Sequence, residues 1–204
     1  PQNPKTPRFK SKINFMVDEV PINRKAVVAG HWKCNGTVDW VRQFCTSTLN
    51  EMRFSPEKVD VIVAPVYIHI ASAKAMLNSN INISVQNIST HKNGPFTGEV
   101  SADQVKDFEL QWTIIGHAER RALFHETKEV VADKILQAQQ AGLNSIICVC
   151  ETSEERAENR TYDVIREQLE AIKPAVTDWS KVVLAYTPVW AVGTGKVASP
   201  EIAQ

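Results

Sequence analysis

Six short apolar runs recur along the chain, and stretches with helical spacing separate them. Each run is long enough for one strand, and Pro188 closes the last one because proline cannot donate to a sheet ladder. Apolar runs of this length are typical of strands that a parallel sheet buries on both faces. The expected strands cover residues 26–30, 59–64, 81–85, 112–116, 145–150 and 182–187.

Helix start and stop signals lie between the runs. Thr37 and Thr127 are placed to act as N-caps, and Gly142 is placed to end the helix that Thr127 starts. Thr152 and Glu155 have the spacing of a capping box. Behind that box, one helical stripe is expected to face the core: Tyr162, Ile165, Leu169 and Ile172.

The regular alternation of strands and helices predicts an α/β fold with a parallel sheet, which can close in two ways. A doubly wound sheet normally carries a glycine-rich phosphate fingerprint after its first strand. Residues 30–33, which read Gly-His-Trp-Lys, do not form one. A (β/α)8 barrel needs eight units in about 250 residues. At that spacing, residues 25–204 supply about six units.

Charge and composition argue against several classes of partner. Lys+Arg and Asp+Glu both total 23, so the net charge gives no reason to expect a nucleic-acid partner. No apolar run approaches the roughly 20 residues of a membrane span, so no membrane partner is expected. The four cysteines lack the paired spacing of a zinc site, and no metal is expected. Free buried thiols fit a reducing compartment.

Residues 1–24 differ from the rest of the chain because they show no clear period. Prolines punctuate them, and the first 17 positions carry four basic residues and no acidic one. They are interpreted as a flexible N-terminal extension, or as the start of a fragment that begins mid-chain. Residues 25–204 are interpreted as one domain.

Polar side chains follow the expected strands where each strand ends. The carboxyl ends of parallel strands meet at one face, which is where α/β enzymes place their catalytic groups. A lysine, histidines and amides at one mouth suit a small anionic substrate such as a sugar phosphate. Taken singly, a lysine can be a solvated loop charge and a histidine can be structural. The candidates are His31, Lys33, Gln86, Asn87, His117, Glu119, Glu151 and Thr187.

The segment after the sixth run has the features of a hinged lid. A rigid Pro188 stands at one end, Gly193 and Gly195 stand at the other, and Trp190 lies between them. A tryptophan at a loop tip usually covers something, which favours a lid over an ordinary strand-to-helix connection.

Four motifs in this order closely resemble triosephosphate isomerase. They are residues 29–36 (AGHWKCNG), 86–87 with 96–101 (QN and FTGEVS), 112–121 (WTIIGHAERR) and 186–196 (YTPVWAVGTGK). The resemblance implies a TIM (β/α)8 barrel, with only about six of its βα units in this chain. It implies interconversion of dihydroxyacetone phosphate and glyceraldehyde 3-phosphate without a cofactor, in glycolysis and gluconeogenesis. It also implies a cytoplasmic homodimer.

The resemblance assigns a role to several residues. Lys33 matches the lysine that holds the substrate and offsets its charge, and Glu119 matches the acid that supports this lysine. His117 matches the electrophile that polarises the carbonyl. Gly193 matches a residue of the lid that closes on the phosphate. His31 stands at the position of an asparagine of the substrate site.

The resemblance also assigns the dimer contact to one loop. Residues 87–101 resemble the family's interdigitating loop. Thr97 lies near the tip of that loop and is expected to reach the lysine region of a second subunit.

The departures from the family pattern predict impaired catalysis. Thr187 stands where the family has the glutamate that acts as base, and Ala118 stands where it usually has serine. Units seven and eight, whose loops supply further phosphate-binding amides, are absent from residues 1–204. One alternative is a non-catalytic barrel relative that acts as a binding or structural protein. Another is a different phosphate-handling barrel in which His31 has taken on new chemistry.

Overall fold

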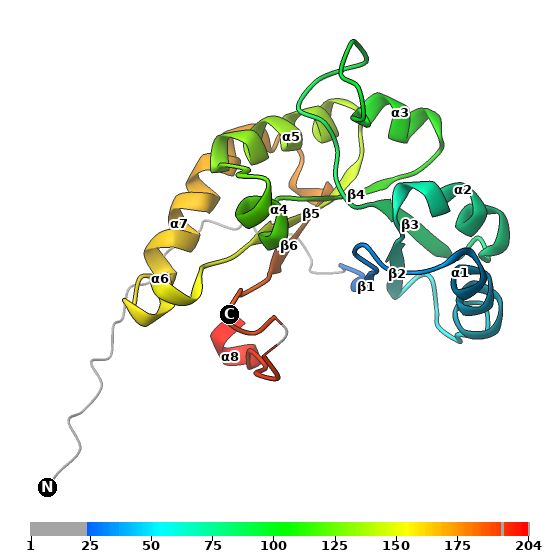
Figure 1. Cartoon of the computed structure of the whole chain (residues 1–204), viewed down its shortest axis with the longest axis horizontal. Helices are drawn as coiled ribbons and strands as arrows, with labels where there is room; N and C mark the ends of the chain where they lie inside the picture. Colours follow the sequence, from blue (N-terminus) through cyan, green and yellow to red (C-terminus); the bar gives the residue numbers. More distant parts are fainter. Residues whose placement is uncertain (1–23, 193, 204) are drawn as a thin grey trace, which may run out of the picture.

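The computed structural model describes residues 24–192 and 194–203, which form one curved parallel sheet with helices along its outer side (Figure 1). Six strands follow one another across the sheet in chain order, and each neighbouring pair is parallel. This arrangement is a curled half-barrel and confirms the predicted fold class. The strands are β1 Ala26–His31, β2 Val59–Ala64, β3 Ile81–Val85, β4 Trp112–Ile115, β5 Asn144–Val149 and β6 Val182–Tyr186.

The helices lie mostly on the convex side of the sheet, where they cover its apolar face (Figure 1). The α-helices are α1 Val38–Phe44, α2 Tyr67–Met76, α3 Ala102–Asp107, α4 Ala118–Leu123, α5 Lys128–Gln140, α6 Ser153–Ala157, α7 Thr161–Ile172 and α8 Pro200–Ala203. A π-helix over Cys45–Leu49 extends α1, and 3₁₀ turns occupy Lys173–Ala175 and Trp179–Lys181. None of the helices in the described part is long and apolar enough to cross a bilayer.

The helix caps form as the sequence predicts. The Thr37 side chain accepts a hydrogen bond from the backbone N–H of Trp40, the third residue of α1. Thr127 accepts one from Val130, the third residue of α5. Thr152 and Glu155 form a complete capping box at the start of α6. Gly142 follows α5 with a φ of 73°, a left-handed conformation that glycine adopts without strain and that stops a helix.

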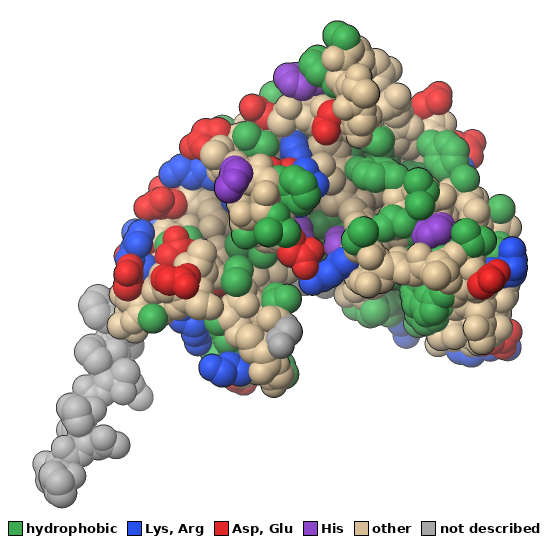
Figure 2. All heavy atoms as spheres, viewed as in Figure 1, with side chains coloured by type: hydrophobic (Ala, Val, Ile, Leu, Met, Phe, Trp, Pro, Cys, Tyr) green, Lys and Arg blue, Asp and Glu red, His purple; other side chains and the backbone are tan. Residues whose placement is uncertain are grey.

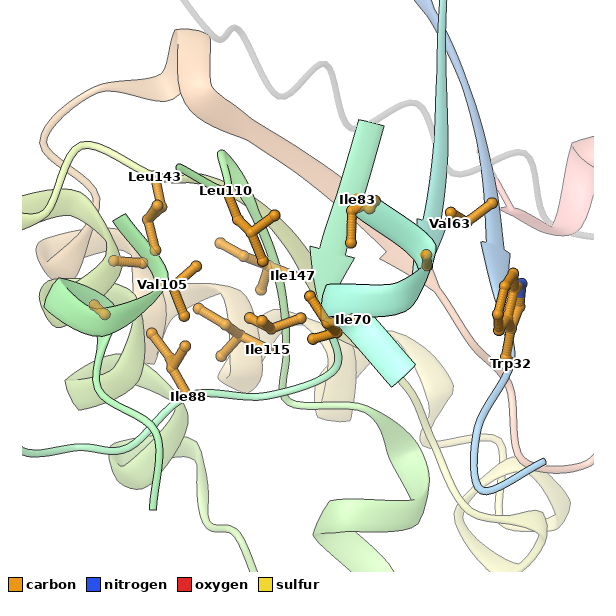
Figure 3. Packing of buried hydrophobic residues seen from close by; sticks show 14 of the residues in the cluster. Trp32, Val63, Ile70, Ile83, Ile88, Val105, Leu110, Ile115, Leu143 and Ile147 are labelled. Carbon is orange, nitrogen blue, oxygen red and sulfur yellow. The ribbon is translucent and has the colours of Figure 1, made fainter. Parts of the chain in front are cut away.

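The main core lies between the sheet and the helices (Figure 3). Ile88, Ile115 and Ile147 are completely buried there. Burying each such side chain contributes about 1.5–3 kcal/mol to folding. A second, smaller cluster includes Ile114 and Ile146, which neighbour Ile115 and Ile147 along the same strands and therefore point to the opposite face of the sheet.

The expectation that every strand is buried on both faces is wrong for the two edge strands. Val28 of β1 is 55% exposed and Leu184 of β6 is 47% exposed. Among the described residues, β1 pairs only with β2, and β6 pairs only with β5. Each edge strand therefore lacks a neighbour on one side, whereas the inner strands have two.

The predicted inward stripe on the helix after residue 160 is also partly wrong. Tyr162 is 57% exposed, and the guanidinium of Arg166 lies over its ring instead. The α7 helix does not continue from α6, because Asn159 adopts a positive φ of 57° between them. The α3 and α4 helices were not predicted, since each is only 6 residues long and shows no full apolar period.

Candidate active site

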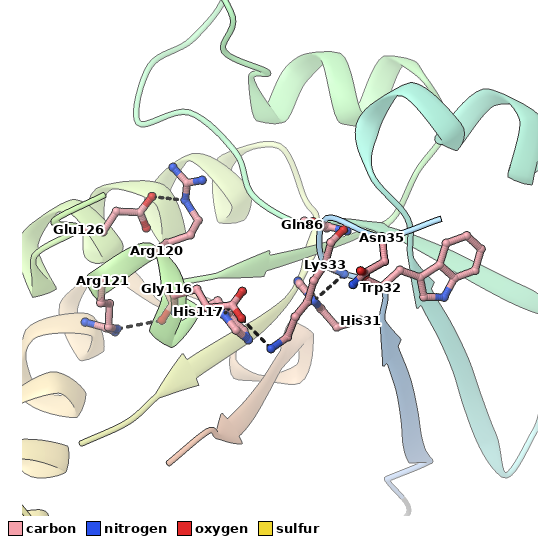
Figure 4. Close-up of polar contacts among 11 residues, drawn as sticks. His31, Trp32, Lys33, Asn35, Gln86, Gly116, His117, Arg120, Arg121 and Glu126 are labelled. Atoms are coloured by element: carbon pink, nitrogen blue, oxygen red, sulfur yellow. Dashed lines mark hydrogen bonds and ion pairs between the residues drawn. The ribbon is translucent and has the colours of Figure 1, made fainter. Parts of the chain in front are cut away.

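The carboxyl ends of the strands bring the predicted polar residues to one rim of the sheet (Figure 4). His31 is the last residue of β1, and His117 is the N-cap residue between β4 and α4. In Figure 2, histidine, basic and acidic side chains lie next to one another at the hollow of the arched molecule. Residues from distant parts of the chain therefore meet where the sequence predicts.

Lys33 and Glu119 form an ion pair across this rim. The Lys33 ammonium donates to Glu119 Oε1 at 2.7 Å, and the two side chains are 35% and 43% exposed. This hydrogen bond from Lys33 is the main reason that the pKa of Glu119 lies below its usual range. The backbone of Lys33 has a φ of 54°, in the left-handed region. Glu119 therefore holds the ammonium of a lysine whose backbone conformation is unusual.

His117 is held as a neutral ring with one defined tautomer. Its Nδ1 accepts the backbone N–H of Glu119 at 3.2 Å, which leaves Nε2 to carry the proton. Burial lowers the pKa of His117, and the Lys33 charge lowers it further. The Glu119 carboxylate, with Oε2 at 3.6 Å from Nδ1, opposes this shift but does not reverse it. The His117–Glu119 contact is thus not an ion pair near neutral pH.

His31 stacks on His117. The two ring centroids are 4.9 Å apart and the ring planes differ by only 8°. The backbone N–H of Lys33 donates to His31 Nδ1 at 3.2 Å. Burial, followed by the charge that His117 acquires when protonated, lowers the pKa of His31 to about 4. Both imidazoles are therefore neutral near pH 7.

Gln86 and Asn87 follow the same strand but serve different parts of the structure. The Gln86 amide donates to the backbone oxygens of Lys33 and Ala64, at 2.9 and 2.8 Å, and so fixes the loop that carries the lysine. The Asn87 side chain instead accepts from Lys134 Nζ at 2.8 Å. Asn87 is thus directed away from the mouth for which it was predicted.

A buried charge cluster lies behind the rim. Glu126 accepts hydrogen bonds from Arg120 and from Lys134, and the Glu126 and Lys134 side chains are each 5% exposed. Burial favours the neutral form of Glu126, but the hydrogen bonds from these two cations outweigh it and lower the pKa. Burial lowers the pKa of Lys134 as well. Because two cations contact it, the buried Glu126 carboxylate is held in its charged form.

Arg121 ties the turn before His117 to the next strand. Its guanidinium donates to the backbone oxygens of Gly116 at 2.8 Å and Cys148 at 3.2 Å. Gly116 itself has a φ of 71°, and a Cβ there would approach Arg121 and Val131 to 3.0 Å. Glycine is therefore required at the turn that presents His117.

Glu151 anchors the segment that was predicted to be a lid. Its side chain is completely buried, and Oε1 accepts from the Tyr186 hydroxyl at 2.7 Å and from Trp190 Nε1 at 2.9 Å. The Arg156 guanidinium lies over the Trp190 ring, 4.0 Å from its centroid, and also contacts Glu151 Oε1 at 3.4 Å. The tryptophan thus has a partner, as the sequence suggests, whereas Gly193 lies outside the described residues.

Thr187 directly follows β6, and its backbone N–H donates to Val149 O at 2.9 Å. Its hydroxyl is buried and has no hydrogen-bond partner among the described residues. The neighbouring Cys148 thiol cannot activate it, because burial raises the pKa of that thiol to about 12. Nothing in this surrounding makes the hydroxyl a base.

Residues 26–204 match the sequence model of the triosephosphate isomerase family. The chain belongs to this family. It is 45% identical over 184 residues to "Triosephosphate isomerase, cytosolic" of Oryza sativa subsp. japonica, an alignment that covers 90% of the chain and 72% of the relative. It is 46% identical over 180 residues to "Triosephosphate isomerase, chloroplastic" of Fragaria ananassa, covering 88% of the chain and 57% of the relative.

Several residues that the sequence predicted for the rim lie together there, but the contacts of some of them were not predicted. Glu151 was a candidate for the mouth, whereas its contacts are with Trp190 and Tyr186. The sequence did contain a signal for this contact. Glu151 directly follows a buried strand, and the indole N–H of Trp190 needs a hydrogen-bond acceptor when it is buried. No group of three histidine, cysteine or acidic side chains in the described part could hold a metal ion.

Proposed function

We propose that the chain descends from an active triosephosphate isomerase and keeps that enzyme's substrate-polarising groups, with catalysis impaired. The reaction is the interconversion of dihydroxyacetone phosphate and glyceraldehyde 3-phosphate, in glycolysis and gluconeogenesis and without a cofactor. One observation carries the proposal: Glu119 contacts both the Lys33 ammonium, at 2.7 Å, and the His117 ring, at 3.6 Å. The family match supports these assignments.

Each group has a task that its surroundings suit. The Lys33 ammonium offsets the charge of the phosphorylated substrate, and Glu119 orients it. The neutral His117 donates from Nε2 to the substrate carbonyl and stabilises the negative charge that develops there. Triosephosphate isomerase is itself a standard example of a neutral catalytic histidine and of a closing loop. We assign the lid role to the segment around Trp190 and Gly193, and a substrate-binding role to His31.

The impairment is proposed from Thr187. The reaction needs a base that removes a proton from the carbon beside the carbonyl, and a carboxylate can do this when its pKa approaches the working pH. The Thr187 hydroxyl is a far weaker base, and the Cys148 thiol beside it is protonated because burial raises its pKa to about 12.

A second candidate function follows from the same hydroxyl. A non-catalytic relative that binds a ligand or a partner has no need of a base, and the unpartnered Thr187 hydroxyl favours this reading. Such a protein would bind the triose phosphate or assemble with a second copy without turning the substrate over.

Replacing Lys33 with methionine should weaken binding of dihydroxyacetone phosphate by about 10- to 100-fold. A hydrogen bond to a charged group contributes about 1.5–3 kcal/mol, and methionine keeps most of the side-chain volume without the charge. Isothermal titration calorimetry on the protein as its gene encodes it measures the change.

Lys74→Met is the matched control for this titration. Lys74 also forms an ion pair, with Glu109 at 2.8 Å, but on an exposed part of the surface. This variant should bind as the parent does. Equal affinity of the Lys33→Met variant and the parent would contradict the proposed role of the ammonium, and absence of binding by the parent would contradict the proposed substrate.

We also propose a homodimer that forms through residues 87–101. The loop is anchored at its root, where the Tyr67 hydroxyl donates to Asn87 O and Lys134 donates to the Asn87 side chain. Its outer residues 91–99 are exposed, and Phe96 stacks on His91 with ring centroids 4.2 Å apart. Large exposed apolar side chains, Ile68 and Phe124, lie in α2 and beside Arg120. An anchored loop with an exposed outer part, on a protein with exposed apolar side chains, suits contact with a second copy.

Thr97→Arg should shift this assembly towards the monomer. Thr97 is exposed near the loop tip, and arginine adds bulk and a charge that must lose water in a tightly fitted interface. Sedimentation velocity gives the mass, with Lys106→Arg on α3 as a control that leaves the charge unchanged. A Thr97→Arg protein that stays dimeric at the concentrations where the parent does would rule out the loop contact.

Residues 25–204 are proposed to be the barrel domain, which agrees with the start of the family match at residue 26. The proposed extension over residues 1–24 falls almost wholly outside the described residues. A cytoplasmic location is proposed on the basis of the cytosolic rice relative and the four free cysteines.

A further inference from the structure

The stacked pair of His31 and His117 is a feature that the proposed function does not explain. The two rings come from β1 and from the turn after β4, which are not adjacent strands of the sheet. They are nevertheless almost parallel at a centroid distance of 4.9 Å, which leaves no room for water between them. One face of the His117 ring is therefore covered by another imidazole.

The two rings have matching hydrogen bonds. His31 Nδ1 accepts the backbone N–H of Lys33, and His117 Nδ1 accepts the backbone N–H of Glu119, both at 3.2 Å. If either Nδ1 were protonated, its N–H would face the backbone N–H that now donates to it, and the hydrogen bond would be lost. Each ring is thus most stable as the neutral tautomer with its proton on Nε2.

Charge reinforces this preference. The titratable and charged groups that act on His117 are Glu119 from α4, Lys33 from the loop after β1, and His31 itself. If both rings were protonated, two positive charges would lie about 5 Å apart beside the Lys33 ammonium. Glu119 could not neutralise all three, since one of its oxygens is already bonded to Lys33 at 2.7 Å.

We propose that His31 is a positioning residue that covers one face of His117 and holds that ring in one orientation and one neutral tautomer. The inference rests on the proposed function, because it concerns the ring that polarises the substrate. In this role His31 acts through His117, and the role is separate from the substrate-binding role proposed for His31 above. Its contribution comes from its flat ring, which keeps water from the face of His117 and so disfavours the charged form.

The test is an NMR titration of the histidine side chains in ¹⁵N-labelled protein, produced as its gene encodes it. In the parent, the His117 Nδ1 signal should be that of an unprotonated acceptor at pH 7 and should change only below the ordinary imidazole pKa of about 6.5. His31→Ala opens the covered face to water, so the pKa of His117 should rise and its protonated fraction at pH 6 should increase several-fold. His31→Phe restores a flat ring without any nitrogen and should bring the His117 titration back towards that of the parent.

Each outcome decides the matter. Equal His117 titrations in the parent and His31→Ala would overturn the inference, and so would a Phe variant that behaves like the Ala variant. If His31→Ala does not fold, His31→Asn takes its place, because asparagine also lacks a ring. A parent protein in which Nδ1 of His117 carries the proton refutes the inference without any variant. Because the titration needs no turnover, an inactive protein still tests the role of His31, and failure of this role leaves the proposed function standing.

Discussion

Thr187→Glu should raise the rate of triose phosphate isomerisation by about 10²–10⁴-fold, the usual contribution of a positioned base. The substitution places a carboxylate directly after β6, at the rim that carries His117 and Lys33. The threonine hydroxyl there has no described group that could remove its proton. A coupled assay that follows glyceraldehyde 3-phosphate or its isomer measures kcat in the parent and in the variant.

Thr187→Gln is the matched control, because glutamine fills the same volume as glutamate but cannot act as a base. It should leave the rate at the level of the parent. Both variants are compared with the parent in the protein as its gene encodes it. A parent that turns over as fast as the glutamate variant would refute the argument from the missing base and make His31 the next residue to replace.

Glu126→Leu should destabilise the fold by about 3–5 kcal/mol, the usual effect of removing one partner of a buried ion pair. The leucine leaves the Lys134 ammonium, which is 5% exposed, without an anion and close to the Arg120 guanidinium. The Asn87 oxygen at 2.8 Å would be its only remaining described acceptor. Denaturant unfolding followed by circular dichroism gives the change in free energy.

Two further variants show whether the loss comes from the buried charge. Glu126→Leu combined with Lys134→Met removes both charges and should recover most of the stability. Glu109→Leu breaks a pair whose carboxylate side chain is 83% exposed, so it should change the free energy of unfolding far less than Glu126→Leu does. If Glu126→Leu lowers the free energy of unfolding by no more than Glu109→Leu does, the prediction is wrong.

The contribution of Glu126 to the stability of the fold should depend on pH in the acidic range. The pKa of Glu126 is lower in the folded chain than its ordinary value of 4.5, because the hydrogen bonds from Lys134 and Arg120 outweigh burial. Its stabilising contribution is therefore complete above pH 4.5 and is lost as the pH falls towards the lower folded value. Glu126→Leu should accordingly lose less stability than the parent over that acidic range.

The sequence predicted the strands and most caps because their signals are local. A threonine such as Thr127 caps a helix through a bond to a backbone N–H only three residues away. The six apolar runs predicted the six strands to within one residue at most ends, since such runs fit a buried parallel sheet. Exposure of β1 and β6 could not be read in the same way, because it depends on which strands lie beside them rather than on their own residues.

The candidate site was predictable only to the level of its rim. The carboxyl ends of parallel strands lie at the same edge of a sheet. His31, Lys33 and His117 therefore lie at that edge, whatever the orientation of their side chains. Contacts such as the stacking of two imidazoles, or the hydrogen bonds from Trp190 and Tyr186 to Glu151, join residues 35 to 86 positions apart. Such contacts depend on side-chain orientation in the finished fold, and no local spacing encodes them.

The left-handed backbone conformation of Lys33 makes it costly to keep a lysine at this position. With a φ of 54°, this residue carries a conformation that costs most residues other than glycine about 1–2 kcal/mol. A protein that served only as a scaffold would lose nothing with glycine at position 33, which adopts this φ without strain. Lysine at this position across natural variants of the gene would show that the ammonium has been selected against a standing loss of stability. Glycine in its place would mark lineages in which the charge is no longer needed.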